Sequence, residues 1–530
     1  MNYAIIFRLL ALIQLALALA FSASFTVGLL FPFGDDESSA VRGLEISAAI
    51  SLGLAALFFW LGRRGPTTIF QKEALAVIGL GWLLASGVGA IPFYLTLDEM
   101  SAADAFFESA SGFTTTGASV ITNLAEVPGA LLFWRALTQW IGGLGVVVFF
   151  VAILSFLGSG AKILFSREYS GNSEDVYDGR MQTGALRIMV LYLVLSALCA
   201  AAYRLAGLNW FEAVCHMFTT VSTGGFGTHP ESLGGFQKPA VEWVAVGFMA
   251  VCGISFLALL RALRGKNLRA VTGDLEARTF GGILLGASLL VLFFLHAQQS
   301  HQSIFDSLRA AVFQVTSILT TTGFSTGNFA DWAFPAQILL LVLMIVGGCS
   351  GSTAGGVKVI RVAVGVRTAL NHLEKAFRPH VIRPIKVNRR SLTSGALEDI
   401  TVFLILAAFI LVFSVILVSF FEPDLDPVSA FSAVVASLFN IGPGLGDVGP
   451  AENFDFLGEP TKIYLALLMI MGRLEFYALL ALFAASITAG KVSAAAPALA
   501  GVLLAILVLR IRGDVPAQRA IAIVLVTASA

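Results

Sequence analysis

Long uncharged apolar segments are the feature that most limits how this chain can fold. Only 12% of its 530 residues are charged and 57% are hydrophobic, whereas soluble domains average about 25% charged residues. The charges are clustered, and about ten of the segments between them are long enough to cross a bilayer as a helix. The sequence therefore predicts an all-α polytopic membrane protein. The first segment, 4–30, is too long for a signal peptide, so we expect it to remain as a helix.

Cysteine and histidine patterns give no indication of a metal or catalytic site. The four cysteines lie singly in apolar segments, and the six histidines form no HExxH-like pair. A GxGxxG pattern at Gly444, Gly446 and Gly449 follows an apolar helix rather than a strand, so it does not predict a dinucleotide site. We therefore expect no enzyme, no cofactor bound by this chain and, at zero net charge, no nucleic-acid partner.

Charged loops predict the topology, because basic loops stay on the cytoplasmic side, the inside, of the membrane. The basic clusters lie at 63–72, 162–180, 261–278 and, most densely, 378–390. Acidic residues collect in the intervening loops, for example at 422–426 and 447–459. The amino terminus is thus expected inside, and the acidic outer side would concentrate cations.

Four internal repeats follow two leading helices. Each repeat reads as a span, a short apolar helix of about ten to thirteen residues, a Gly/Thr-rich turn and a second span. Such short helices cannot cross a bilayer and are typical of re-entrant segments. The predicted ranges are 1–66 for the leading helices, 67–160, 161–270, 271–375 and 376–491 for the four repeats, and 492–530 for an apolar tail that the charge rule does not place.

The four turns predict one shared ion site. Irregular backbone at membrane depth is tolerated where it lines a wet cavity or is buried in protein, and rings of backbone carbonyls can replace the hydration shell of potassium. Glycine permits the positive φ that such a turn needs. One such turn would most simply be an ordinary loop; four at matching positions argue against that reading. The predicted ion-binding residues are Thr115, Thr116, Gly117, Thr223, Gly224, Gly225, Thr321, Thr322, Gly323, Asn440, Ile441 and Gly442.

The fourth turn differs from the other three. It has Asn440 and Ile441 where the others have threonine or glycine, so the ring is expected to be asymmetric. None of the turns carries an acidic residue, which favours carbonyl ligands over a carboxylate ring. We therefore expect a single main ring of ligands and moderate discrimination between potassium and sodium.

These turns resemble a known family. Segments 109–117, 220–226, 320–324 and 440–444 are similar to the filter turns of the Trk, Ktr and HKT potassium transporter superfamily, over residues 70–490. The two leading spans make the chain most similar to its bacterial TrkH/TrkG membrane subunits. The apolar tail departs from that pattern, because such chains usually end soon after the last core span.

A glycine-rich segment interrupts the second span of the third repeat. Each glycine costs a helix about 1 kcal/mol relative to alanine, so a rigid helix is not expected there. The resemblance implies an intramembrane gating loop under the filter; the alternative is a helix kink for close packing. The gate residues are then Gly347, Gly348, Cys349, Ser350, Gly351, Ser352, Thr353, Ala354, Gly355 and Gly356.

Arg473 lies in the second span of the fourth repeat. A charge inside a membrane helix is costly and usually faces a cavity or a partner. The resemblance implies that Arg473 is an electrostatic barrier below the filter. The alternative is neutralisation by Glu475, although residues two apart point to different helix faces; a partner in another span is left open.

The resemblance implies potassium uptake across the bacterial inner membrane, by a homodimer with a cytosolic TrkA-like nucleotide-binding regulatory subunit, surrounded by membrane lipid. Channel-like and ion-coupled transport both remain open. A first alternative is the potassium-binding subunit of an ATP-driven pump, which shares the four-repeat plan. A second is a polytopic membrane enzyme, which would need a cluster of acid, base or metal-binding residues that the sequence does not contain.

Overall fold

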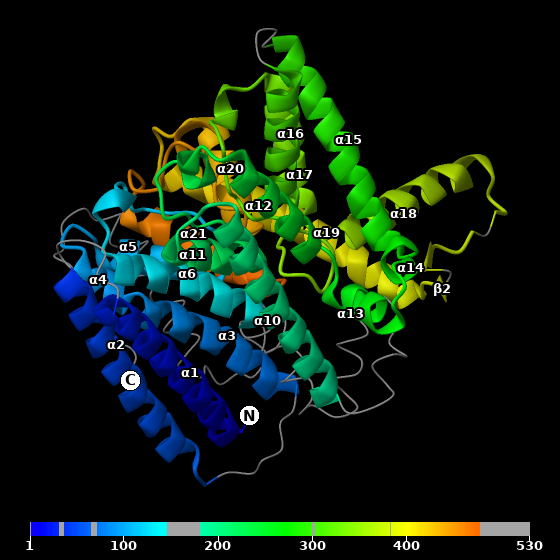
Figure 1. The fold of residues 1–530 in the computed structure, drawn as a ribbon. Coiled ribbons are helices and arrows are strands. Elements are labelled where there is room, and N and C mark those ends of the chain that lie inside the picture. The colour runs from blue at the N-terminus through cyan, green and yellow to red at the C-terminus, as the bar shows by residue number, and fades with distance from the viewer. Residues whose placement is uncertain are drawn as a thin grey trace.

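The computed structural model (Figure 1) describes residues 2–30, 37–64, 71–145, 181–298, 303–381, 383–388 and 390–476. Within these ranges six helices are long and apolar enough to cross a membrane, or seven if a sharply bent pair counts as one span. The chain is therefore a multi-pass membrane protein with an all-α fold, as predicted. The apolar tail 492–530 and the whole of the basic loop at 162–180 lie outside the described residues.

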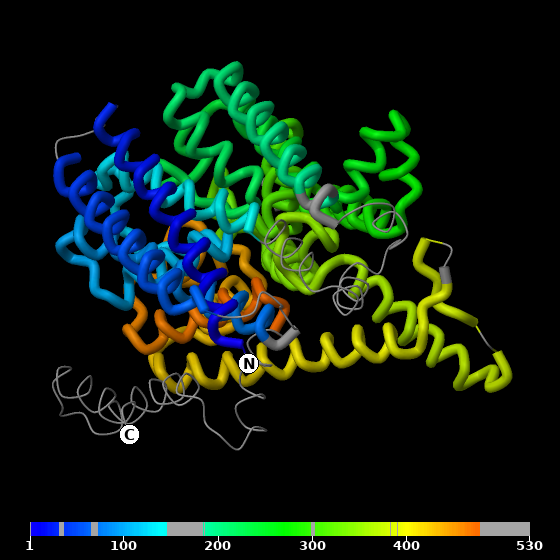
Figure 2. The backbone as a smooth tube through the Cα atoms, turned by 90° about the horizontal axis from the view of Figure 1, so that it is seen from below, coloured from blue at the N-terminus to red at the C-terminus, as the bar shows by residue number. Residues whose placement is uncertain are grey.

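The two leading helices pack against the first repeat. Helices α1 (Tyr3–Leu30) and α2 (Glu37–Gly62) contact each other along their length and also contact the helices that follow. Figure 2 shows them side by side at one edge of the molecule. The Glu37 carboxylate accepts a hydrogen bond from the backbone N–H of Ala130, at 3.2 Å, which ties α2 to repeat one.

Four repeats of the same plan follow. The first spans are α3 with α4 (Gln71–Gly89, Ile91–Thr96), α10 (Met181–Leu205), α15 (Leu275–Gln298) and α19 (Ser394–Phe421). The short helices are α5 (Ala102–Phe113), α11 (Trp210–Val221), α16 (Ile304–Leu319) and α20 (Pro427–Leu438). The second spans are α6 (Gly129–Leu144), α12 (Pro239–Cys252), α17 (Phe334–Val346) and α21 (Glu459–Arg473). Single 3₁₀ turns precede them, at η1 (Leu124–Glu126), η3 (Ser232–Phe236), η4 (Phe329–Asp331) and η5 (Gly446–Val448).

Each short helix starts at a side-chain cap. The capping side chain accepts a hydrogen bond from a first-turn N–H, which would otherwise lack a partner. The caps are Ser101, Asn209, Ser303 and Asp426. Three of these helices have the predicted length, at 12 residues; α16 is longer than predicted, at 16, because it begins one turn earlier.

Contacts between neighbouring repeats close a ring. Each short helix packs against the second span of the preceding repeat: α11 on α6, α16 on α12, α20 on α17, and α5 on α21. The last of these pairs joins the first repeat to the fourth. The four turns that end the short helices are thereby brought to one central place.

Within the described residues, two second spans are broken. Helix α12 ends at Cys252, and α13 (Phe256–Gly265) continues at 92° to it, followed by α14 (Arg269–Thr272). Helix α17 ends at Val346, and the chain becomes helical again only in α18 (Val359–Phe377). Helix α18 extends beyond the bundle in both views (Figures 1 and 2). A two-stranded hairpin, β1 (Lys386–Val387) with β2 (Arg390–Ser391), leads to α19.

Candidate functional site: a ring of four turns

The four turns share one backbone conformation. In each turn a positive φ occurs at two positions, first two residues before the glycine and then at the glycine. The first position is Thr115, Thr223, Thr321 or Asn440, with φ between 53° and 57°. The second is Gly117, Gly225, Gly323 or Gly442, with φ between 82° and 106°. A left-handed threonine is uncommon, so its recurrence at matching positions indicates a conformation that the surrounding structure imposes.

The glycines meet carbonyl oxygens of the next repeat. A Cβ atom added to any of them would lie within 3 Å of the carbonyl oxygen just before the next glycine. The pairs are Gly117 with Gly224, Gly225 with Thr322, Gly323 with Ile441, and Gly442 with Thr116. The turns thus form a closed ring in the order one, two, three, four. Only glycine fits there, because of the positive φ and because of the neighbouring backbone.

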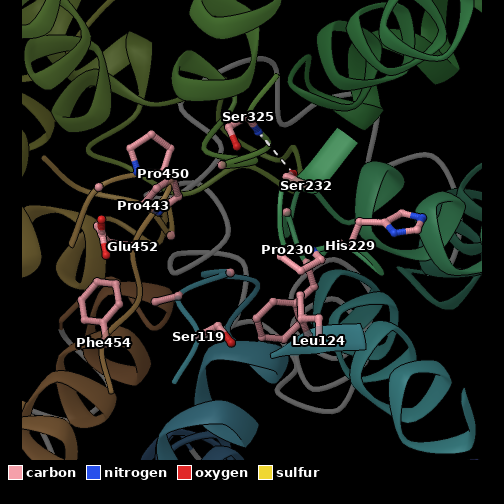
Figure 3. A pocket seen from close by; sticks show the side chains of 18 of the residues that line it. Ser119, Leu124, His229, Pro230, Ser232, Ser325, Pro443, Pro450, Glu452 and Phe454 are labelled. Atoms are coloured by element: carbon pink, nitrogen blue, oxygen red, sulfur yellow. Dashed lines mark hydrogen bonds between the residues drawn. The ribbon is translucent and has the colours of Figure 1, made fainter. Parts of the chain in front are cut away.

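A cavity opens on one side of this ring. It has a volume of about 90 Å³ and is lined by all four glycines and by the residues that follow them. Figure 3 shows Ser119, Ser325 and Pro443 around it, from three different repeats, with His229 and Glu452 further out. Its carbonyl and hydroxyl oxygens are ligands that can replace the hydration shell of a monovalent cation.

Hydroxyl groups stiffen two of the turns. Thr114 and Thr116 pair through their hydroxyls at 2.7 Å, and Thr320 and Thr322 do so at 2.8 Å. The Thr116 hydroxyl also accepts a hydrogen bond from Asn440 in the fourth turn.

Asn440 keeps the backbone of the ring regular. Its φ of 57° matches that of the three threonines, and asparagine adopts this conformation more readily than most residues. Its side-chain Nδ2 donates to Thr116 Oγ1 and to the carbonyl oxygen of Met469, both at 2.9 Å. Ile441 is buried and adds a carbonyl to the ring. The predicted asymmetry therefore concerns side chains and not the path of the backbone.

The glycine-rich segment leaves the helix and lies on the other side of the ring. Gly355 N–H donates to Thr321 Oγ1 at 2.6 Å, and Gly356 N–H donates to the carbonyl oxygen of Phe439 at 3.0 Å. Thr353 Oγ1 donates to the carbonyl oxygen of Val221 at 3.2 Å. These partners precede the ring glycines, whereas the cavity is lined by residues after them. The segment is a loop packed under three turns, so the kinked-helix alternative is wrong.

Further contacts hold this loop at both ends. Cys349 N–H donates to the carbonyl oxygen of Gly253, where α12 breaks, at 2.9 Å, and Phe256 N–H donates back to the carbonyl oxygen of Gly351 at 3.0 Å. The Glu276 carboxylate accepts from Ser350 N–H at 2.7 Å and from Ile360 N–H at 3.3 Å. Of the remaining predicted gate residues, Gly347 and Gly348 precede these anchors, directly after α17, and Ser352 and Ala354 lie between them.

Arg473 points to the loop and not to Glu475. Its Nη1 donates to the carbonyl oxygen of Thr353 at 2.9 Å. Its Nε and Nη2 atoms are buried and have no hydrogen-bond partner among the described residues. Glu475 instead pairs with Arg361 at the start of α18. Neutralisation of Arg473 by Glu475 is therefore wrong, and the partner is in another repeat.

Two residues of α6 that the sequence analysis did not single out also hold the ring. Gln139 donates from Nε2 to the carbonyl oxygen of Gly224 at 2.7 Å and accepts from Phe226 N–H at 3.1 Å. Arg135, one turn earlier, donates to the carbonyl oxygen of Gly227 at 3.0 Å. The sequence does contain a signal for these two residues, which are an arginine and a glutamine four apart in an otherwise apolar helix. Polar groups inside a membrane helix usually face a functional site or a partner.

Two leading helices, four repeats and a closed ring of turn carbonyls define a polytopic cation-transport protein. The chain belongs to the TrkH cation transport protein family, whose model matches residues 48–494. The resemblance inferred from the turns is thus confirmed.

Individual relatives are similar in sequence to this chain over most of their length. The chain is 35% identical to the Trk system potassium uptake protein TrkH of Salmonella typhimurium, over 84% of this chain and 92% of that one. It is 34% identical to the protein of the same name from Halomonas elongata, over 91% and 98%. The crystal structure of the potassium transporter TrkH from Vibrio parahaemolyticus matches with a TM-score of 0.82 and 33% identity, covering 91% of this chain and 98% of that one.

Proposed function

We propose that this chain takes up potassium across the bacterial inner membrane through the ring of Gly117, Gly225, Gly323 and Gly442. The observation that carries the proposal is the closure of that ring, in which each glycine lies against a carbonyl of the next repeat. A ring of oxygens can replace the hydration shell of the ion. The relatives' names, Trk system potassium uptake proteins, support potassium as the substrate.

The loop 347–356 is the gate in this proposal, and Arg473 is a cationic barrier beside it. The loop packs under the turns at Thr321 and Phe439, so an ion that leaves the ring must pass it. Arg473 holds the loop through Thr353 and brings a positive charge to the same place. Moving the loop would therefore remove an obstruction from the path and break the contact between the loop and Arg473.

The protein works as a homodimer with a cytosolic TrkA-like nucleotide-binding regulatory subunit. Exposed basic residues lie where two elements next to the gate end, with Arg264 and Lys266 at the end of α13 and Lys375 and Arg378 at the end of α18. Helix α18 follows the loop directly, so a protein bound there could pull on it. Light scattering of the detergent-solubilised protein is expected to give twice the mass of one 56.0 kDa chain; a single-chain mass would contradict the dimer.

The test is uptake of radiolabelled Rb⁺ into proteoliposomes that contain the purified chain. We expect uptake above that of empty vesicles, and stronger competition by K⁺ than by Na⁺. We expect this uptake without any added ATPase. If uptake required an ATPase and ATP, the chain would instead be the potassium-binding subunit of an ATP-driven pump. Absence of uptake, or equal competition by the two ions, would contradict the proposal.

A further inference from the structure

Glu108 and Arg135 form a buried ion pair next to the first and second turns of the glycine ring. Glu108 of α5 is fully buried, and Arg135 of α6 is 2% exposed. Arg135 Nε donates to Glu108 Oε1 at 2.6 Å. Burying two charges costs free energy that their attraction does not always recover. Such a pair therefore needs a reason beyond stability.

Glu108 holds the segment that follows the first ring glycine. Its carboxylate accepts from Ser119 Oγ at 3.1 Å and from Val120 N–H at 3.0 Å. Ser119 lies two residues after Gly117 and lines the cavity (Figure 3). Hydrogen bonds to a charged group are stronger than those between neutral groups. The carboxylate thus fixes the outer part of turn one.

Arg135 holds the matching segment of the second turn. Its Nη1 donates to the carbonyl oxygen of Gly227, two residues after Gly225, at 3.0 Å. Its guanidinium also lies over the ring of Phe226, 3.5 Å from the ring centre. One side chain therefore joins Glu108 to the outer part of turn two, and the ion pair connects two adjacent segments of the ring.

The other three repeats have neutral residues at the position of Glu108, nine residues before each ring glycine. His216 bonds through Nδ1 to the carbonyl oxygen of its own helix residue Glu212, at 2.9 Å. Gln314 reaches the carbonyl oxygen of Phe324 over a longer distance of 3.4 Å. Ala433 has no polar side-chain atom. At this position only repeat one holds its turn with a charge.

We propose that the Glu108–Arg135 pair, through its contacts with Ser119, Val120 and Gly227, is a positioning pair that sets the discrimination between potassium and sodium. This role for the ion pair rests on the proposed function, because it requires the ring to be the site that selects the ion. A ring that is free to contract accommodates the smaller ion better, so restraining two adjacent segments favours the larger one. The two charges cancel, so the restraint leaves no net charge beside the ion path.

The test compares wild-type protein with Arg135→Lys and Glu108→Asp in the proteoliposome assay. Lysine keeps the charge but has one nitrogen, so it cannot contact Glu108 and Gly227 in the same way as the guanidinium. Aspartate keeps the charge but is one methylene shorter. We expect each variant to transport, with the ratio of Na⁺ to K⁺ half-inhibitory concentrations reduced about tenfold, as loss of a charge-assisted hydrogen bond implies.

A matched control is the pair Glu242–Arg309, which joins α12 to α16 at 3.0 Å near the starts of those helices. Glu242→Asp and Arg309→Lys are expected to keep the wild-type ratio. A wild-type ratio in Arg135→Lys or Glu108→Asp would overturn the proposal while leaving potassium uptake intact. Failure of both variants to assemble, with the control variants intact, would also overturn it, because the pair would then serve folding. Wild-type protein without uptake would instead refute the proposed function.

Discussion

Arg473 Nη1 donates a hydrogen bond to the carbonyl oxygen of Thr353, at 2.9 Å, across 120 residues of sequence. This contact connects the second span of repeat four to the loop under the ring. It places a guanidinium beside the loop, on the proposed ion path, and two nitrogens of that guanidinium have no hydrogen-bond partner among the described residues. The Arg473 side chain therefore both holds the proposed gate loop by a hydrogen bond and places a positive charge beside it.

Arg473→Ala is expected to raise the uptake rate. The variant removes the hydrogen bond that holds the loop and the charge that repels cations. A hydrogen bond from a charged donor contributes about 1.5–3 kcal/mol, which shifts a two-state gate about tenfold or more. Initial rates of Rb⁺ uptake into proteoliposomes measure the change. An unchanged rate at equal protein content would refute the barrier role.

Gly323→Ser and Gly442→Ser are expected to weaken the preference for potassium while leaving membrane insertion intact. A Cβ atom at Gly323 would overlap the carbonyl oxygen of Ile441, and both glycines have positive φ. Gly286→Ser on α15 is the control, because a Cβ atom there meets nothing within 4 Å. Competition curves with K⁺ and Na⁺ provide the measurement. Wild-type curves in both ring variants would mean that the ring is not the selective site.

Asn440→Thr tests whether the asparagine matters for its backbone or for its side chain. Threonine occupies the same position in the other three turns with φ of 53° or 54°, so the turn should form. The bonds to Thr116 and Met469 would be lost. We expect assembled protein with a potassium affinity about three- to tenfold lower, the effect of one or two neutral hydrogen bonds. Equal affinity would show that the cross-repeat bonds do not shape the ring.

Asp104→Asn is expected to lower the thermal stability of the detergent-solubilised protein. Lys462 Nζ lies 2.6 Å from Asp104 Oδ1, and this contact joins repeat four to repeat one. Burial opposes ionisation of this carboxyl, but the adjacent Lys462 ammonium favours it, and its pKa lies below the usual 3.8. The advantage of wild type should therefore persist above that pH and disappear only as the pH falls through the lowered pKa.

The measurement for Asp104→Asn is the melting temperature by intrinsic fluorescence at neutral pH. The substitution leaves Lys462 with only its longer contact to Asp455, at 3.5 Å, so a loss of about 1.5–3 kcal/mol is expected, the contribution of one hydrogen bond to a charged group. Arg383→Gln is a suitable comparison, since its contact with Glu374 at 3.1 Å is largely exposed and such pairs contribute about 0–1 kcal/mol. Equal melting temperatures for the two variants would contradict a stabilising role for Lys462 and Asp104.

The sequence by itself determined the membrane class, the two leading helices, the four repeats and the four ring glycines. These features are local: apolar segments longer than a bilayer, and turns in which only glycine tolerates the backbone. The loop 347–356 was also readable, because so many small residues cannot hold a helix. Each of these features depends on residues close together in the sequence, so it can be predicted without knowing which distant segment packs against it.

Only the tertiary structure decided which residues meet. It paired Arg473 with Thr353 and Glu475 with Arg361, where the sequence had offered Glu475 as a partner for Arg473. It joined Glu108 and Arg135 to two turns, and it showed that Asn440 follows the same backbone as three threonines. The physical reason is that these contacts join segments far apart in the chain. Helix periodicity and turn composition carry no information about which segment of another repeat will lie opposite.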